Sequence, residues 1–174
     1  MITEGQFKII GGGTAFITYL INAHKSVRDN LYPEAQKAEI DKLLNWFQFK
    51  MRPETQLLIR MIVPPKVLGG QATALDKKQK QKDLIFADNG LLSALNGPLS
   101  RTGKYICGST PTVVDILFYC EISTIIALTR SGENLGEHNR NVTEWFKRMK
   151  TIEGLPQLDS EMSELINKFD LAEK

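Results

Sequence analysis

The chain has 174 residues and a formal net charge of +2, which gives no reason to expect a nucleic acid or a lipid surface as its partner. Its 42% of hydrophobic residues is typical of a globular protein and excludes bulk disorder. Apolar runs stay shorter than the ~18 residues of a membrane span, and the N-terminal residues lack the pattern of a secretory signal. We therefore expect an intracellular, cytoplasmic protein, and the sequence leaves the question of an organelle open.

The first third of the chain begins with a short strand and continues as helix. Residues 6–10 alternate between apolar and polar like a strand, and residues 14–24 then place apolar side chains at helical spacing. Pro33 suits the first position of a further helix with a long apolar face, because its missing N–H costs nothing there. We expect Pro53 to bend or interrupt this helix and Pro64-Pro65 to end it.

The middle of the chain predicts two more helices. The first covers about residues 76–95, and Asn96-Gly97-Pro98 is expected to end it. The second covers residues 116–128, is almost entirely apolar, and is expected at the centre of the core. Its start carries a capping box, because the Thr112 hydroxyl can accept from the Asp115 N–H while the Asp115 carboxylate accepts from the Thr112 N–H.

The last part of the chain predicts a polar loop over residues 130–139 and two short amphipathic helices, over 142–149 and 160–169. Repeats and low-complexity segments are absent from the sequence. The fold class is therefore mainly all-α, a helical bundle preceded by one or two short β-strands and a helix.

Several segments carry a family resemblance. Residues 108–115, Gly-Ser-Thr-Pro-Thr-Val-Val-Asp, look like the G-x-x-x-[ST]-x-A-D segment that opens helix 6 of the cytosolic glutathione S-transferases. Residues 141–149 are similar to the helix 7 pattern of that superfamily, an aliphatic residue followed by tryptophan and a basic residue. Residues 31–33 and 44–46, followed by Arg52, resemble the theta class. The chain thus resembles the C-terminal helical domain of these enzymes, with the theta class closest.

This resemblance implies two parts, residues 1–30 as the last strand and helix left from a thioredoxin-like domain and residues 31–174 as the helical domain. Family members bind glutathione in the thioredoxin-like domain, where a Glu/Gln-Ser pair holds the γ-glutamyl group. That pair falls here on Gly12 and Gly13, which have no side chain to donate or accept. The catalytic serine or tyrosine and the cis-proline of the family would precede residue 1. We therefore expect no catalytic residue, no glutathione binding and no other cofactor.

One arginine and one run of lysines are open to a functional interpretation. Arg52 aligns with an arginine that theta enzymes place near the active site, so it is a remnant of a substrate site or a solvated helix residue, and we favour the latter. A run of lysines near a predicted helix start is either a solvated face or an interface for an acidic partner: Lys77, Lys78, Lys80 and Lys82.

Thiols and histidines offer no metal or nucleophile pattern. Cys107 and Cys120 are most simply core thiols, because neither has a base beside it in the sequence. His24 and His138 lie far apart and lack further ligands nearby. We expect no metal site.

Three functions remain open. The first is a non-catalytic glutathione S-transferase-like protein that acts as a structural, assembly or interaction subunit of a larger complex. It would bind another protein, or a second copy, through residues 1–30 and the face that the missing thioredoxin-like domain would cover. The alternative is a theta-like transferase that conjugates glutathione with a catalytic domain missing here or supplied by another chain. A carrier with a hydrophobic pocket between helices is the third.

Overall fold

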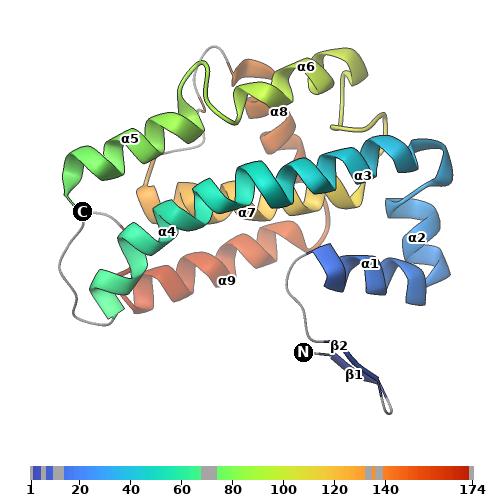
Figure 1. Ribbon diagram of the computed structural model, residues 1–174, viewed down its shortest axis with the longest axis horizontal. Coiled ribbons are helices and arrows are strands. Elements are labelled where there is room, and N and C mark those ends of the chain that lie inside the picture. Colours follow the sequence, from blue (N-terminus) through green and yellow to red (C-terminus); the bar gives the residue numbers. More distant parts are fainter. Residues whose placement is uncertain are drawn as a thin grey trace.

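The structure is a computed structural model, and it describes residues 2–4, 7–9, 14–67, 74–131, 135 and 139–172. Most of these residues are helical, and the helices pack into one bundle around a shared hydrophobic core (Figure 1). The expected fold class is therefore confirmed.

The N-terminal segment forms a hairpin followed by two helices. Strand β1 (Ile2–Glu4) pairs antiparallel with β2 (Phe7–Ile9), and Figure 1 shows this hairpin apart from the helical bundle. Helices α1 (Thr14–Ala23) and α2 (Lys25–Leu31) follow. Ile21 is only 4% exposed and belongs to the core, so α1 is attached to the bundle.

The next elements join into one long rod along the bundle. A 3-10 turn (Glu34–Gln36) leads into α3 (Lys37–Trp46), a π-helical turn (Phe47–Met51) and α4 (Arg52–Val67). Pro33 lies at the N-cap of the 3-10 turn with extended backbone, so the helical rod begins at Glu34, one residue later than predicted.

One of the two proline predictions for this rod was wrong. The regular α-helix is interrupted directly before Pro53, as expected, by the wider π-helical turn, which changes the backbone pairing where a proline would otherwise collide with an α-helical carbonyl. Pro64 and Pro65, in contrast, do not stop α4, since the helix includes both and runs to Val67. Because proline has no N–H to donate, the last turn of α4 lacks two of its backbone hydrogen bonds.

The single helix predicted over about residues 76–95 is instead two helices, α5 (Leu75–Phe86) and α6 (Ser93–Thr102). The break is set at Gly90, whose N–H donates to the Ala87 carbonyl at 2.7 Å. A Cβ at this glycine would lie 2.8 Å from the Ile85 carbonyl oxygen, so the turn admits no side chain there. Such a close backbone approach depends on the folded turn and has no local sequence signature beyond the glycine itself.

Asn96-Gly97-Pro98 was also expected to end this helix, and it lies inside α6 instead. The residue that ends α6 is Gly103, which has φ of 75° and donates its N–H to the Leu99 carbonyl at 2.8 Å. This left-handed glycine is the usual helix terminator, nearly two turns later than predicted.

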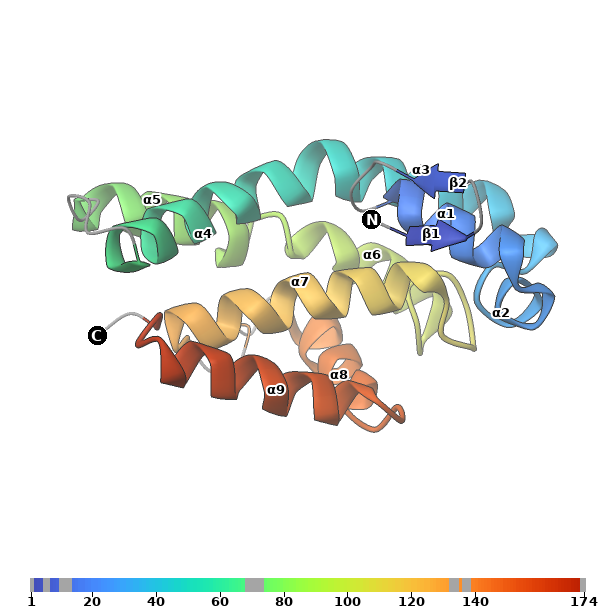
Figure 2. The ribbon, with the colours of Figure 1, turned by 90° about the horizontal axis from the view of Figure 1, so that it is seen from below.

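Helix α7 (Val113–Thr129) runs through the middle of the bundle. The rod of α3 and α4 lies on one side of it, and α8 (Arg140–Met149) and α9 (Leu155–Lys168) lie on the other (Figure 2). Its central position agrees with its nearly all-apolar sequence. Helix α9 begins earlier than expected, because Gly154 with φ of 87° forms its N-cap.

The loop before α8 is partly buried. Both of its described residues past Ser131, Leu135 and Asn139, are buried. The Asn139 amide donates to the Leu135 carbonyl at 2.9 Å and accepts from the Asn96 amide at 3.1 Å. Asn139 therefore connects the segment predicted as a polar loop to α6.

The predicted capping box is present at the start of α7. Thr112 and Asp115 exchange the two expected hydrogen bonds, and the Asp115 carboxylate is fully buried. Beyond the box, this carboxylate accepts from the Ile106 N–H at 2.8 Å and from the Trp145 indole N–H at 2.8 Å. Burial raises the pKa of Asp115 above its usual value, and these hydrogen bonds oppose the shift.

We expect Asp115→Ala to lower the free energy of unfolding by about 3–5 kcal/mol, because the buried donors of Ile106, Thr112 and Trp145 lose their acceptor. Urea unfolding followed by circular dichroism measures this. The control Glu144→Ala removes an exposed carboxylate paired with Lys147 and should cost less than about 1 kcal/mol. Equal losses in the two variants would show that the carboxylate has no special role.

Candidate functional site

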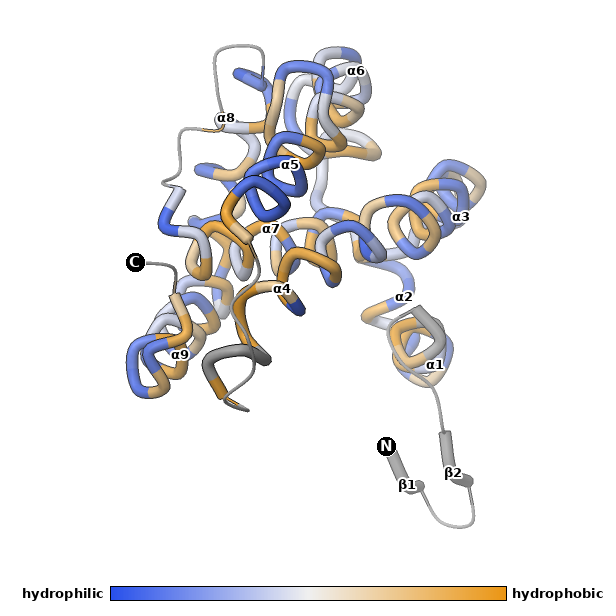
Figure 3. The backbone as a smooth tube through the Cα atoms, turned by 60° about the vertical axis from the view of Figure 1, so that its left-hand side comes forward, coloured by the Kyte–Doolittle hydropathy of each residue, from blue (hydrophilic) through white to orange (hydrophobic). Residues whose placement is uncertain are grey.

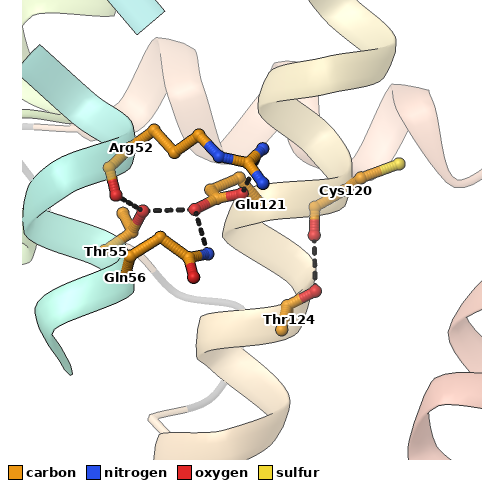
Figure 4. A network of polar contacts seen from close by, with 6 residues as sticks. All are labelled: Arg52, Thr55, Gln56, Cys120, Glu121 and Thr124. Carbon is orange, nitrogen blue, oxygen red and sulfur yellow. Dashed lines mark hydrogen bonds and ion pairs between the residues drawn. The ribbon is translucent and has the colours of Figure 1, made fainter. Parts of the chain in front are cut away.

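A polar cluster joins α4 to α7 and forms the candidate site (Figure 4). Thr55 is fully buried on α4, and its hydroxyl lies 3.0 Å from the Arg52 carbonyl and within hydrogen-bond distance of the Glu121 carboxylate. A hydroxyl has one proton, and the charged carboxylate is the stronger acceptor. The Gln56 amide also donates to Glu121, at 3.3 Å. One carboxylate on α7 thus receives two donors from α4.

Arg52 completes the cluster at its solvent side. Its Nη1 atom lies 4.0 Å from the Glu121 carboxylate, and the side chains of Arg52 and Glu121 are 36% and 11% exposed. A guanidinium carries five N–H donors in one plane. Because this partly exposed guanidinium has more donors than one carboxylate uses, a carboxylate of a ligand or partner could also accept from it.

Of these residues, the sequence singled out only Arg52. The structure brings it together with Thr55, Gln56 and Glu121, none of which was predicted. One signal was present: Glu121 is the only charged residue between 116 and 129, in a helix that is otherwise suited to the core. A lone carboxylate in such a helix indicates a buried polar partner.

A second polar cluster joins α7 to α9. The Tyr119 hydroxyl and the Ser123 hydroxyl both donate to Asp159, the latter at 2.5 Å. Tyr119 is fully buried, and Asp159 is half-buried. The cluster fixes how α9 lies against α7, and we assign it no chemistry.

The two thiols lack the surroundings of a nucleophile. Both are half-buried and pack against the core. Burial, followed by the charge of Asp115 and Glu39, raises the pKa of Cys107 to about 11, against a hydrogen bond with Thr112 that lowers it. Burial is also the main reason that the pKa of Cys120 is raised. A reactive cysteine needs the opposite shift.

The remaining candidates of the sequence lie elsewhere. Gly12, Gly13 and His138 fall outside the described residues, and His24 is exposed between α1 and α2. Within the described part of the chain, no group of three or more His, Cys, Asp or Glu side chains could hold a metal ion. Nor is any described helix both long and apolar enough to cross a membrane.

The lysine run lies along α5, which is hydrophilic over much of its length (Figure 3). Lys77 and Lys80 are exposed, whereas Lys78 and Lys82 are half-buried. This arrangement fits a largely solvated face, and the docking of an acidic partner there stays a prediction.

We expect Glu121→Ala to lower the free energy of unfolding by about 1–3 kcal/mol, because the buried Thr55 hydroxyl loses its charged acceptor. Arg52→Ala should cost less than about 1 kcal/mol, because its ion pair is partly exposed. Urea unfolding of both variants measures the difference. A larger loss for Arg52→Ala would mean that the ion pair, rather than the buried hydrogen bond, holds α4 to α7.

We also expect slow alkylation of the folded chain. At pH 8 a thiol with a pKa of about 11 has roughly 100-fold less thiolate than one with the ordinary value of 9.0, so Cys107 should react about 100-fold more slowly with iodoacetamide than in urea. Mass spectrometry of the peptide that contains Cys107 measures both rates. Equal rates in the folded and the unfolded chain would restore this thiol as a candidate nucleophile.

Comparisons with known proteins identify the family of the fold in which this site lies. The family described as "Glutathione S-transferase, C-terminal domain" matches residues 50–153, which include the cluster between α4 and α7. The chain is also similar to the solved structure of Bombyx mori glutathione transferase BmGSTD1, with 25% identity and a TM-score of 0.67 over 95% of this chain and 70% of that one. No curated protein matches. Because the family match covers more than half of its length, the chain belongs to the glutathione S-transferase C-terminal domain family.

Proposed function

We propose that this chain is a non-catalytic member of its family and serves as a protein-interaction subunit of a larger complex. One observation carries the proposal: two large apolar side chains lie exposed on the rod formed by α3 and α4, Phe49 at 72% and Leu57 at 42%. We call the surface around them the α4 outer face, defined by Phe49, Pro53, Leu57 and Arg60. Their spacing of three or four residues places them on one side of the helix.

This surface has the composition of a docking site. Exposed aromatic and aliphatic side chains on a rigid element are the usual anchors of protein interfaces. Lys50 and Arg60 are exposed beside the two apolar residues, and Arg52 is held next to them by Glu121. A basic rim around an apolar centre favours a folded domain with an apolar patch and an acidic rim. The proposed occupant is therefore a domain of another protein.

The N-terminal segment supports the same function. The hairpin of β1 and β2 is a two-stranded sheet, so among the described residues both strands have an unpaired edge. An isolated hairpin is marginally stable in water, and a partner strand would stabilise it. We propose that residues 1–30, as the remnant of a thioredoxin-like domain, extend the interface beyond residues 31–174.

The absence of catalysis is proposed on two grounds. By resemblance, the γ-glutamyl clamp of the family falls on Gly12 and Gly13, and glycine has no side chain to form it. The raised pKa of Cys107 and of Cys120 also makes each thiol a poor replacement nucleophile.

The test places a photoreactive benzoylphenylalanine at position 49 of the full chain in its native cell. The matched control carries it at position 165, where Leu165 is 50% exposed on α9. We expect a crosslink to one protein from position 49 only. With that protein purified, Phe49→Ser should raise the Kd at least about tenfold, and Leu165→Ser less than about twofold.

Two outcomes would contradict the proposal. One is an equal effect of the two substitutions, which would place the interface elsewhere. The other is a native chain that stays a monodisperse monomer and gives no crosslink from position 49.

Glutathione conjugation is the second candidate, and the place of Arg52 beside Glu121 favours it. The Arg52 guanidinium lies 4.0 Å from the Glu121 carboxylate and is partly exposed, and by resemblance a theta-like transferase would place this arginine near its active site. Retention on immobilised glutathione and activity with a chlorinated nitrobenzene test the candidate. Activity that is lost in Arg52→Ala and kept in the control Lys50→Ala would favour conjugation over the non-catalytic role.

A further inference from the structure

We infer that a cavity between α3 and α6 binds a small aromatic carboxylate. The cavity has a volume of about 200 Å³. It is separate from the cluster of Arg52 and Glu121 and from the α4 outer face, and it includes no residue of either. The inference therefore stands independently of the proposed function.

The walls of this cavity are apolar and well fixed. Leu43 and Trp46 of α3 face Leu95 and Pro98 of α6 across it. Leu43 and Leu95 are 7% and 1% exposed, so both are held by the core. A wall that is already ordered binds a ligand without the entropic cost of fixing mobile side chains.

Trp46 is the aromatic residue of the wall, and a stacking contact with α7 fixes the orientation of its ring. Its ring stacks on Phe118 of α7 with 5.7 Å between ring centroids and 8° between ring planes. Aromatic rings attract one another by stacked or edge-to-face contact. A cavity of about 150 Å³ can hold benzene, so this one has room for a single six-membered ring and a small substituent.

The charged residues that line the cavity determine which substituent the ring of the ligand should carry. Lys42 and Glu39 both line the cavity, and they pair with each other at 3.3 Å. Arg101 is the remaining charged residue of the lining, and it forms no ion pair with a described residue. The cavity thus has a net charge of about +1, which matches one carboxylate. A guanidinium binds a carboxylate through two parallel hydrogen bonds, so the pair is also geometrically specific.

The same features exclude other ligands. A phosphate ester carries close to two negative charges, which one guanidinium cannot balance. Glutathione, a tripeptide, is too large for a cavity of about 200 Å³. A neutral aromatic molecule would fill the space but leave Arg101 without its anion.

The test uses 4-fluorobenzoate as the probe and its neutral amide, 4-fluorobenzamide, as the matched ligand. Fluorine NMR of the probe and fluorescence of the full chain follow binding. The chain has two tryptophans, and Trp145 is fully buried, so quenching on titration reports on Trp46. We expect saturable binding of the carboxylate with a Kd below about 1 mM and at least tenfold weaker binding of the amide.

Variants then locate the site. Arg101→Gln should raise the Kd for 4-fluorobenzoate at least about tenfold, whereas the control Lys104→Gln should leave it within about twofold. Ala94→Phe fills the cavity from an exposed position of α6 and should abolish binding with the far-ultraviolet circular dichroism unchanged. The inference is overturned by equal binding of acid and amide, by an unchanged Kd in Arg101→Gln, or by no saturation up to about 10 mM.

Discussion

The fold depends on providing hydrogen-bond donors to one buried carboxylate. Asp115 is fully buried, and it accepts hydrogen bonds from the start of its own helix, from Ile106 in the loop after α6, and from Trp145 of α8. A charge in that position is tolerated only while all of these donors are in place. The loop, the first turn of α7 and helix α8 must therefore assemble together. Helices α3, α4 and α9 then pack on α7.

Helix α7 shows how a nearly all-apolar element can still specify its neighbours. Apolar contact has no direction, so it would allow α4 and α9 to slide or rotate along the helix. Glu121 on one side and the hydroxyls of Tyr119 and Ser123 on the other make directional bonds to α4 and to Asp159 of α9. These few polar groups select one register out of many that would bury similar apolar area. The candidate site between α4 and α7 is at the same time one of these register contacts.

Features that depend on neighbours in sequence were predicted well. The capping box of Thr112 and Asp115 and the core helix that follows need only the chemistry of one turn and an apolar pattern. The error at Asn96-Gly97-Pro98 arose because the proline and glycine rules consider only local sequence, whereas a close backbone contact at Gly90 and the left-handed Gly103 decide where the helices break and end. The candidate site could be predicted only through Arg52. Its partners Thr55 and Glu121 are 66 residues apart, and their meeting depends on how two helices are rotated toward each other.

The π-helical turn over Phe47–Met51 has a consequence for how this fold can diverge. A π-helical turn holds one residue more than the α-helical turn it replaces, for nearly the same total rotation. Removing one residue from it therefore restores a regular α-helix and leaves the two flanking segments in nearly the same relative direction. Trp46 and its cavity precede the turn, Phe49 lies within it, and Arg52 and Leu57 follow it. A deletion of one residue in the regular part of α3 or α4 would instead rotate one surface by about 100° against the other. The turn is thus the position in the rod where the length of the chain can change while the two surfaces keep their relative direction.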